Sequence, residues 1–192
     1  MIPGGFDLYS ELSRRGALLE GHFRLSSGRH SDRFVQKFRL LEDPALLEPV
    51  AREIAGRFRA AAPTVVVSAA VGGILLGYEV ARALGTKAIF VEKEQGTPVL
   101  RRGFTLSPED RALVVEDVVT TGLSVGEVLE VVRSHGAAIA GIGVIVLRGE
   151  KGFTGGLPLE VLLELPLESY DEASCPQCRA GVPMDDPGSR RT

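Results

Sequence analysis

One stretch decides the fold, and it reads Leu113-Val114-Val115-Glu116-Asp117-Val118-Val119-Thr120-Thr121-Gly122-Leu123-Ser124-Val125. Its apolar start predicts a buried strand, and this strand ends in two adjacent carboxylates. A loop with hydroxyl groups and a glycine follows, and a helix begins near Ser124. Ligands in open α/β sheets bind at the carboxyl ends of the strands. The stretch therefore predicts an α/β fold with a ligand site at this edge of its sheet.

The loop at residues 120–124 suits a phosphate group. A helix N-terminus offers unpaired N–H groups and a partial positive charge, and Gly122 lets the backbone curl around an anion. The two carboxylates would repel a phosphate, but they accept hydrogen bonds from sugar hydroxyls. A ligand with vicinal hydroxyls and a terminal phosphate, such as ribose 5-phosphate, satisfies both ends. The alternative is a strand followed by an acidic N-cap and an ordinary helix.

Strands and helices alternate along the rest of the chain. We expect strands at residues 65–67, 88–91, 112–115, 142–147 and 159–165, and helices at residues 7–15, 44–62, 74–84 and 124–135. Short valine-rich runs separated by helices imply a central, mostly parallel sheet with helices on both faces. Residues 92–108 have no clean period and predict a long loop. We expect one domain over residues 1–192.

Composition narrows the function classes. The net charge of −3 argues against general nucleic-acid binding, which needs a basic footprint. The sequence shows neither a signal peptide nor an apolar run long enough to span a bilayer. We therefore expect a soluble, cytoplasmic protein that binds neither nucleic acid nor a membrane.

The two cysteines form one Cys175-Pro-Gln-Cys178 pair in a turn-rich tail. Zinc usually takes four ligands, and the chain has no second cysteine pair. His22, His30 and His135 show no metal spacing and stay unassigned. Metal or redox chemistry remains an alternative, but the pair is interpreted as a tail element that stays reduced.

The stretch at residues 113–125 resembles the 5-phosphoribosyl 1-diphosphate signature of the type I phosphoribosyltransferases. The resemblance implies that Glu116 and Asp117 hold the ribose 2′- and 3′-hydroxyls and take part in catalysis. It also implies that residues 120–124 hold the 5-phosphate and that the loop at residues 70–74 contacts the diphosphate. The implied residues that bind 5-phosphoribosyl 1-diphosphate are Glu116, Asp117, Val118, Val119, Thr120, Thr121, Gly122, Leu123, Ser124, Val71, Gly72 and Gly73.

In detail the chain is similar to the orotate phosphoribosyltransferases, on the motifs Phe23-x-Leu-x-Ser-Gly-Arg-x-Ser31 and Gly-Val-Ile-Val-Leu-Arg148. This implies transfer of ribose 5-phosphate to orotate, giving orotidine 5′-phosphate and diphosphate in pyrimidine synthesis. A small hood from residues 1–41 and about 159–185 would cover the base. The implied orotate-binding residues are Thr120, Arg148, Phe34 and Arg29. A purine-type phosphoribosyltransferase and a non-catalytic regulator that kept the sugar-phosphate site remain alternatives.

The chain departs from better-known relatives in its basic residues. Those relatives carry lysines where this chain has Ser26 and Gly72, and their mobile loop keeps only Lys93 here. Arg101 and Arg102 are candidates for the missing positive charge. The resemblance implies that Lys93 is catalytic and that a lid reaches the neighbouring active site of a homodimer. Mg²⁺ is expected to arrive on the diphosphate, without direct protein ligands.

Overall fold

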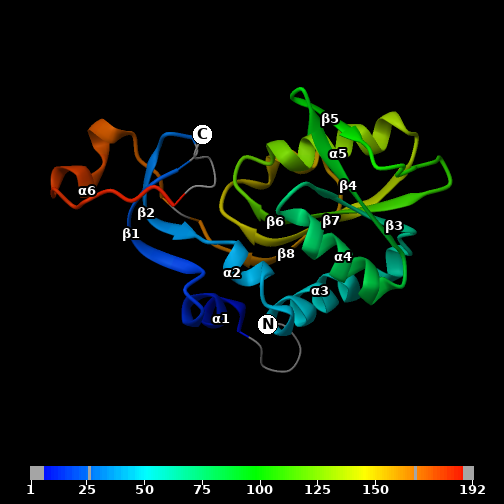
Figure 1. Ribbon diagram of the computed structural model, residues 1–192, viewed down its shortest axis with the longest axis horizontal. Coiled ribbons are helices and arrows are strands. Elements are labelled where there is room, and N and C mark those ends of the chain that lie inside the picture. Colours follow the sequence, from blue (N-terminus) through cyan, green and yellow to red (C-terminus); the bar gives the residue numbers. More distant parts are fainter. Residues whose placement is uncertain (1–6, 26, 167, 188–192) are drawn as a thin grey trace.

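The computed structural model describes residues 7–25, 27–166 and 168–187. The strands of its main sheet are β3 (Val65–Ala69), β4 (Lys87–Glu94), β5 (Thr97–Leu100), β6 (Arg111–Val119), β7 (Ala138–Leu147) and β8 (Leu159–Glu164). Their order across the sheet is β5-β4-β3-β6-β7-β8 (Figure 1). All neighbouring pairs are parallel except β4 and β5, so the prediction of a mostly parallel sheet is confirmed.

Helices cover both faces of this sheet. On one face lie α3 (Pro44–Phe58) and α4 (Gly73–Leu84), and on the other lies α5 (Leu123–Ser134). The strand β3 shows why its valines are consecutive: Val66 packs in the core beneath α3 and α4, while Val65 and Val67 pack in the core beneath α5. A strand buried on both faces needs apolar residues at every position rather than at alternate ones.

Local signals set the helix ends. Asp43 caps α3 by accepting a hydrogen bond from the Ala45 amide at 2.9 Å, and Pro44 occupies the first helical position, where its missing N–H costs nothing. Gly85 ends α4 in the left-handed region, with φ of 76°. The structure also contains α1 (Leu8–Arg14), as predicted, and α2 (Phe38–Leu41), which was not. Short 3-10 turns are η1 (Arg59–Ala61), η2 (Lys151–Thr154) and η3 (Glu172–Ser174).

A second, smaller sheet lies at one end of the molecule (Figure 1). It is an antiparallel hairpin of β1 (Leu18–Arg24) and β2 (His30–Val35). The C-terminal tail, which contains η3 and α6 (Pro176–Arg179), lies against this hairpin. His30 on β2 exchanges backbone hydrogen bonds of 2.8 Å with Tyr170 of the tail. We call this hairpin and residues 168–187 the hood. The C-terminal segment of the hood was expected to span residues from about 159 to 185, but its first part, β8, pairs with β7 in the main sheet.

Residues 92–108 were expected to be a long loop, and this is wrong for the first half. β4 extends to Glu94, and β5 returns antiparallel to it after a turn at Gln95 and Gly96. Both turn residues have positive φ, 51° and 86°, which is the geometry of a tight hairpin turn. Residues 92–97 around the turn are mostly polar and lie at the sheet edge, so hydrophobic periodicity did not reveal this part of the hairpin. No helix in the described part of the chain is both long and apolar enough to cross a bilayer.

Candidate active site

The loop between β6 and α5 forms an open anion cradle. Gly122 has φ of 78°, and a Cβ atom there would collide with the Phe153 ring, so the position requires glycine. The N-cap residue Gly122 offers no side-chain cap to α5. The Leu123 amide makes only a long contact of 3.4 Å with Thr121 Oγ1, which leaves the other N–H groups of the first turn for a ligand. A hollow of about 140 Å³ lies here, lined by Glu116, Val118, Val119, Thr120, Thr121, Gly122, Leu123, Ser124 and Val125.

Two buried carboxylates lie beside this cradle, at the end of β6. Glu116 and Asp117 are only 6% and 1% exposed. Burial, reinforced by the charge of Asp117, raises the pKa of Glu116 to about 8. Asp117 Oδ1 accepts a hydrogen bond of 2.6 Å from the Val118 amide. Asp117 Oδ2 is buried and has no hydrogen bond of good geometry within the described residues.

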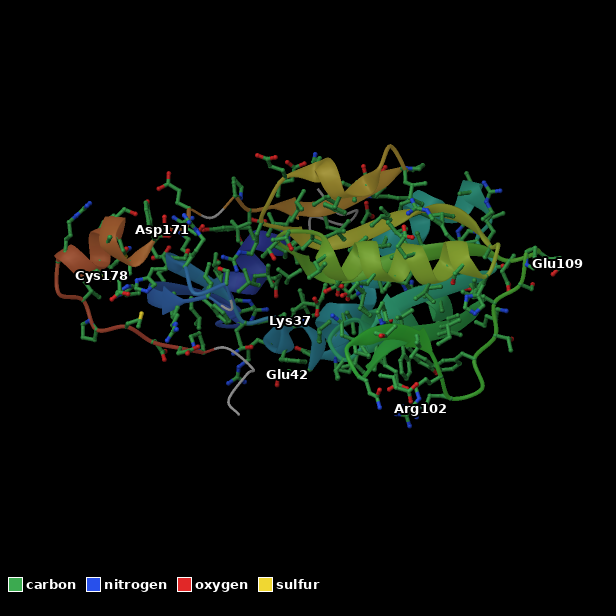
Figure 2. All side chains as sticks on the ribbon, turned by 90° about the horizontal axis from the view of Figure 1, so that it is seen from above. Lys37, Glu42, Arg102, Glu109, Asp171 and Cys178 are labelled. Carbon is green, nitrogen blue, oxygen red and sulfur yellow. The ribbon has the colours of Figure 1, made fainter. Side chains whose placement is uncertain are left out.

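Lys37 completes this group, and the sequence did not identify it. Its Nζ lies 3.2 Å from Asp117 Oδ1 and 3.1 Å from Oδ2, although only the first contact has hydrogen-bond geometry. Its positive charge opposes the rise in the pKa of Glu116. In Figure 2 Lys37 lies between the hood and the main sheet. Two features of the sequence could have identified it: Lys37 is one of only four lysines, and it lies two residues after the last residue of β2.

Gly72 is positioned against this ion pair. A Cβ atom at residue 72 would collide with both Lys37 Nζ and Asp117 Oδ2. The loop from Ala70, whose peptide bond to Val71 is cis, therefore approaches the carboxylate closely because it has no side chain there. Val71 itself is 74% exposed. The structure thus brings the predicted loop at residues 70–74 to the predicted acid pair.

Arg148 lies at the end of β7, next to the cradle. Its amide donates to the Val119 carbonyl at 2.8 Å, and Gly149 packs so closely on the Thr120 carbonyl that a Cβ atom would collide with it. Burial lowers the pKa of Arg148, and its Nε has no hydrogen-bond partner among the described residues. The alternative of a surface ion pair finds no support there, since no described carboxylate lies within ion-pair distance.

Phe34 and Arg29, the two predicted orotate-binding residues of the hood, contact different groups. Phe34 packs against Phe23, with ring centroids 5.8 Å apart. Arg29 holds the tail: its Nε donates to Ser169 Oγ at 2.9 Å and its Nη1 to Asp171 Oδ1 at 2.7 Å. The orotate contact expected of Arg29 remains a prediction. Ser26 lies outside the described residues.

The basic residues of the expected lid are paired within the chain and do not join the acid pair. Lys93 Nζ lies 2.7 Å from Glu127 Oε1 on α5. Arg102, labelled in Figure 2, donates from Nε to Glu92 Oε1 at 2.9 Å and lowers the pKa of Glu92. Arg101 Nη1 lies 3.4 Å from Glu94. Each of these contacts is exposed and therefore weak.

The arrangement suits a ligand with hydroxyl groups at one end and a phosphate at the other. Buried carboxylates accept from hydroxyl donors, and the uncapped helix N-terminus favours an anion. Among the described residues, only two carboxylates stand at this site. That number is too small for an all-protein magnesium cage, but it fits Mg²⁺ that is carried mainly by substrate phosphates.

Comparison with known proteins agrees with this geometry. Residues 39–154 match the family model of the phosphoribosyl transferase domain. The chain is 46% identical to the orotate phosphoribosyltransferase of Pelotomaculum thermopropionicum, covering 96% of this chain and 97% of the relative. It is 48% identical to that of Chlorobium phaeobacteroides, covering 91% of each. The crystal structure of orotate phosphoribosyltransferase from Aeropyrum pernix superposes with a TM-score of 0.67 at 33% identity, covering 83% of this chain and 94% of that one. The chain therefore belongs to the phosphoribosyltransferase family, on its orotate phosphoribosyltransferase branch.

Proposed function

We propose that the chain transfers ribose 5-phosphate from 5-phosphoribosyl 1-diphosphate to orotate, giving orotidine 5′-phosphate and diphosphate for pyrimidine synthesis. The observation that carries this is the buried acid pair, Glu116 and Asp117, beside the uncapped N-terminus of α5. A cytoplasmic location is part of the proposal.

In this reaction the protein mainly positions the sugar. The carboxylates accept from the ribose hydroxyls and the residues 120–124 hold the 5-phosphate, so the anomeric carbon is fixed while its bond to diphosphate breaks with oxocarbenium character. Because the pKa of Glu116 is about 8 without ligand, the group is largely protonated at neutral pH. Sugar hydroxyls favour the ionised form, so binding should release a proton from Glu116.

The departing diphosphate needs positive charge. Mg²⁺ bound to it would supply charge neutralisation. Lys37 is the cation of this chain that lies beside Gly72, on the loop proposed to contact the diphosphate. We assign to Lys37 the role of orienting Asp117 and of adding positive charge where better-known relatives have a lysine at the Gly72 position. Arg101 and Arg102 can add charge only after their contacts with Glu92 and Glu94 open.

The orotate carboxylate is assigned to Arg148. A guanidinium group binds a carboxylate through two parallel hydrogen bonds, and the unpartnered Nε of Arg148 supports this role. Thr120, whose carbonyl packs against Gly149, lies close enough in the fold to contact the same base. Phe34 would contribute an apolar face from the hood.

The activity is tested by adding 5-phosphoribosyl 1-diphosphate and Mg²⁺ to the protein with orotate and following the loss of orotate absorbance. We expect turnover with orotate, none with hypoxanthine or adenine, and loss of turnover after chelation, because the diphosphate leaves as a metal complex. Turnover with a purine base instead of orotate would favour the purine-type alternative. Tight binding of 5-phosphoribosyl 1-diphosphate without turnover of any base would favour a regulator.

Lys37→Met should lower kcat/KM by about 10- to 100-fold, the usual loss for a hydrogen bond to a charged group. It should also raise the pKa of Glu116 further, because Lys37 lowers it in the wild type. Steady-state kinetics and the pH dependence of kcat/KM measure both effects. Lys87→Met is the matched control, since Lys87 pairs with Asp110 at 3.1 Å, just before β6 begins and so at the end of that strand opposite the acid pair. Equal kinetics for the two variants would contradict the role given to Lys37.

A homodimer with shared active sites is part of the proposal. Leu75 and Tyr78 are 50% and 62% exposed one turn apart on α4, which supports a contact with a second copy. For Lys93 to reach that copy, its exposed ion pair with Glu127 must open, at a cost of about 0–1 kcal/mol.

Mixing two inactive variants tests the shared site. Asp117→Asn and Lys93→Ala should each inactivate both sites of their own homodimer, whereas a mixed dimer holds both lesions in one site and none in the other. Reassembly of equal amounts should restore about a quarter of the sites. Assays before and after reversible dissociation measure the recovery. No recovery would mean that Lys93 acts within its own chain.

A further inference from the structure

Four potential metal ligands meet in the hood, well apart in sequence from the acid pair. His22 lies on β1, and His30 is the first residue of β2. Cys175 directly precedes α6, and Cys178 lies within it. One ligand atom from each residue lies within 4.8 Å of all the others. The hairpin supplies both imidazoles and the tail supplies both thiols, so the group joins segments about 150 residues apart.

The distances match those between the ligands of one tetrahedral zinc ion. With the usual zinc–nitrogen and zinc–sulfur bonds, such ligands lie about 3.3 Å apart for two nitrogens and about 3.6 Å apart for nitrogen and sulfur. His22 Nε2 lies 3.1 Å from His30 Nδ1 and 3.6 Å from each sulfur. His30 Nδ1 lies 3.2 Å from Cys178 Sγ. These four distances differ from the expected values by at most a few tenths of an ångström, and the remaining ligand pairs lie within 4.8 Å.

The surroundings prepare His22 to act as a ligand. Its Nδ1 lies 2.8 Å from the Val182 carbonyl, so Nδ1 carries the proton and donates it. The lone pair is therefore on Nε2, the atom that faces the two sulfurs. A ligating histidine typically donates its other ring N–H to a carbonyl or carboxylate in this way.

The group is buried but holds weak donors. His22 and His30 are each 4% exposed, and Cys175 is fully buried. With neutral thiols, Cys175 Sγ donates to Gln177 Oε1 at 3.4 Å and the other contacts are thiol–imidazole hydrogen bonds, which are weaker than bonds to a metal ion. The two cysteines are not joined by a disulfide. Two thiolates and a divalent cation would make the buried group neutral.

We propose that His22, His30, Cys175 and Cys178 bind a structural Zn²⁺ that fastens the tail to the β1–β2 hairpin. Binding releases the two thiol protons, and both imidazoles bind as neutral groups: Zn²⁺ plus two thiols gives a neutral Cys₂His₂ centre and two protons. All four positions are protein ligands, so the ion is closed to substrates and has a structural role. The proposal does not depend on which reaction the chain catalyses.

Metal analysis of the full chain, purified without chelator and reconstituted with Zn²⁺, tests the proposal. We expect one zinc per chain in the wild type and in the control His135→Gln, whose imidazole lies outside the group. Cys178→Ser and His30→Gln should lose at least nine tenths of it. Replacement with Co²⁺ should give the intense absorption of a tetrahedral thiolate site. Zinc retained by both ligand variants would overturn the proposal.

Because a ligand variant can fail to fold, a second measurement uses the wild type alone. With zinc bound, both cysteines should resist a thiol reagent, and a chelator should make both reactive and lower the Tm by several degrees. Zinc should restore protection, and Mg²⁺ should not. Equal thiol reactivity and Tm with and without zinc would overturn the proposal, as would a Cys175–Cys178 disulfide in protein isolated under reducing conditions.

Discussion

Asp117→Asn is expected to lower kcat/KM by about 10²-fold or more. The carboxylate is 1% exposed, pairs with Lys37, and keeps one buried oxygen without a hydrogen bond in the described structure. Asparagine has nearly the same shape, but it replaces one acceptor oxygen with a donor NH₂ group and removes the charge that holds Lys37. A ribose hydroxyl would then meet a donor where it needs an acceptor.

The matched control is Asp110→Asn. Asp110 is also paired with a lysine, Lys87 at 3.1 Å, but it precedes β6 and so lies at the opposite end of that strand. Asp110→Asn should lower the free energy of unfolding, because it removes this ion pair, and it should leave kcat/KM unchanged. If a folded Asp117→Asn protein has wild-type kinetics, the two acids serve only as a strand end and helix cap.

The Asp117→Asn variant should also shift the pKa of Glu116. Burial is the main cause of its raised pKa, and the charge of Asp117 is the second, so removing that charge should lower the pKa of Glu116 from about 8. A carboxyl group with a raised pKa stabilises the fold below its ordinary pKa and loses that contribution as the pH rises through the folded value. The wild-type free energy of unfolding should therefore decline between about pH 4.5 and 8 on account of Glu116, and the decline should end at lower pH in the variant.

Local signals were sufficient for the fold and for the position of the strand–loop–helix at residues 113–125. Consecutive valines at residues 65–67 favoured a strand buried on both faces, and Gly122 marked the turn before α5; phosphate binding by this loop stays a prediction. These features depend on neighbours in the sequence. The strand at residues 88–91 was predicted, but its extension to Glu94 and the strand β5 were missed, because residues 92–97 are mostly polar and lie at the sheet edge.

Contacts between residues far apart in the sequence could not be predicted from the sequence alone. Lys37 meets Asp117 across 80 residues, and His30 meets Cys178 across 148. No periodicity or spacing links such residues, because the contact exists only after β1 and β2 fold onto the main sheet and the tail. The cysteine pair was therefore interpreted as a simple tail element, although two histidines complete a four-ligand group around it.

Arg148→Ala is expected to raise the KM for orotate by about 10²-fold and to change the KM for 5-phosphoribosyl 1-diphosphate by less than about threefold. The reason is chemical: Arg148, at the end of β7, is the cation proposed to bind the orotate carboxylate, whereas the acid pair and the loop at residues 120–124 are the groups proposed to bind the sugar phosphate. Truncation to alanine removes a partly buried guanidinium group. No acidic side chain among the described residues pairs with this group, so orotate would be its carboxylate partner. Steady-state kinetics with each substrate varied in turn would separate the two constants.

Arg148→Lys distinguishes recognition from charge alone. Lysine keeps the positive charge but loses the planar fork that binds a carboxylate with two hydrogen bonds, so an intermediate KM for orotate is expected. Arg133→Ala is the control, because Arg133 is an exposed residue of α5 that pairs with Glu130. Equal increases in both KM values for Arg148→Ala would mean that Arg148 supports the loop at Thr120 rather than the base. Only a selective increase for orotate assigns the guanidinium to the substrate carboxylate.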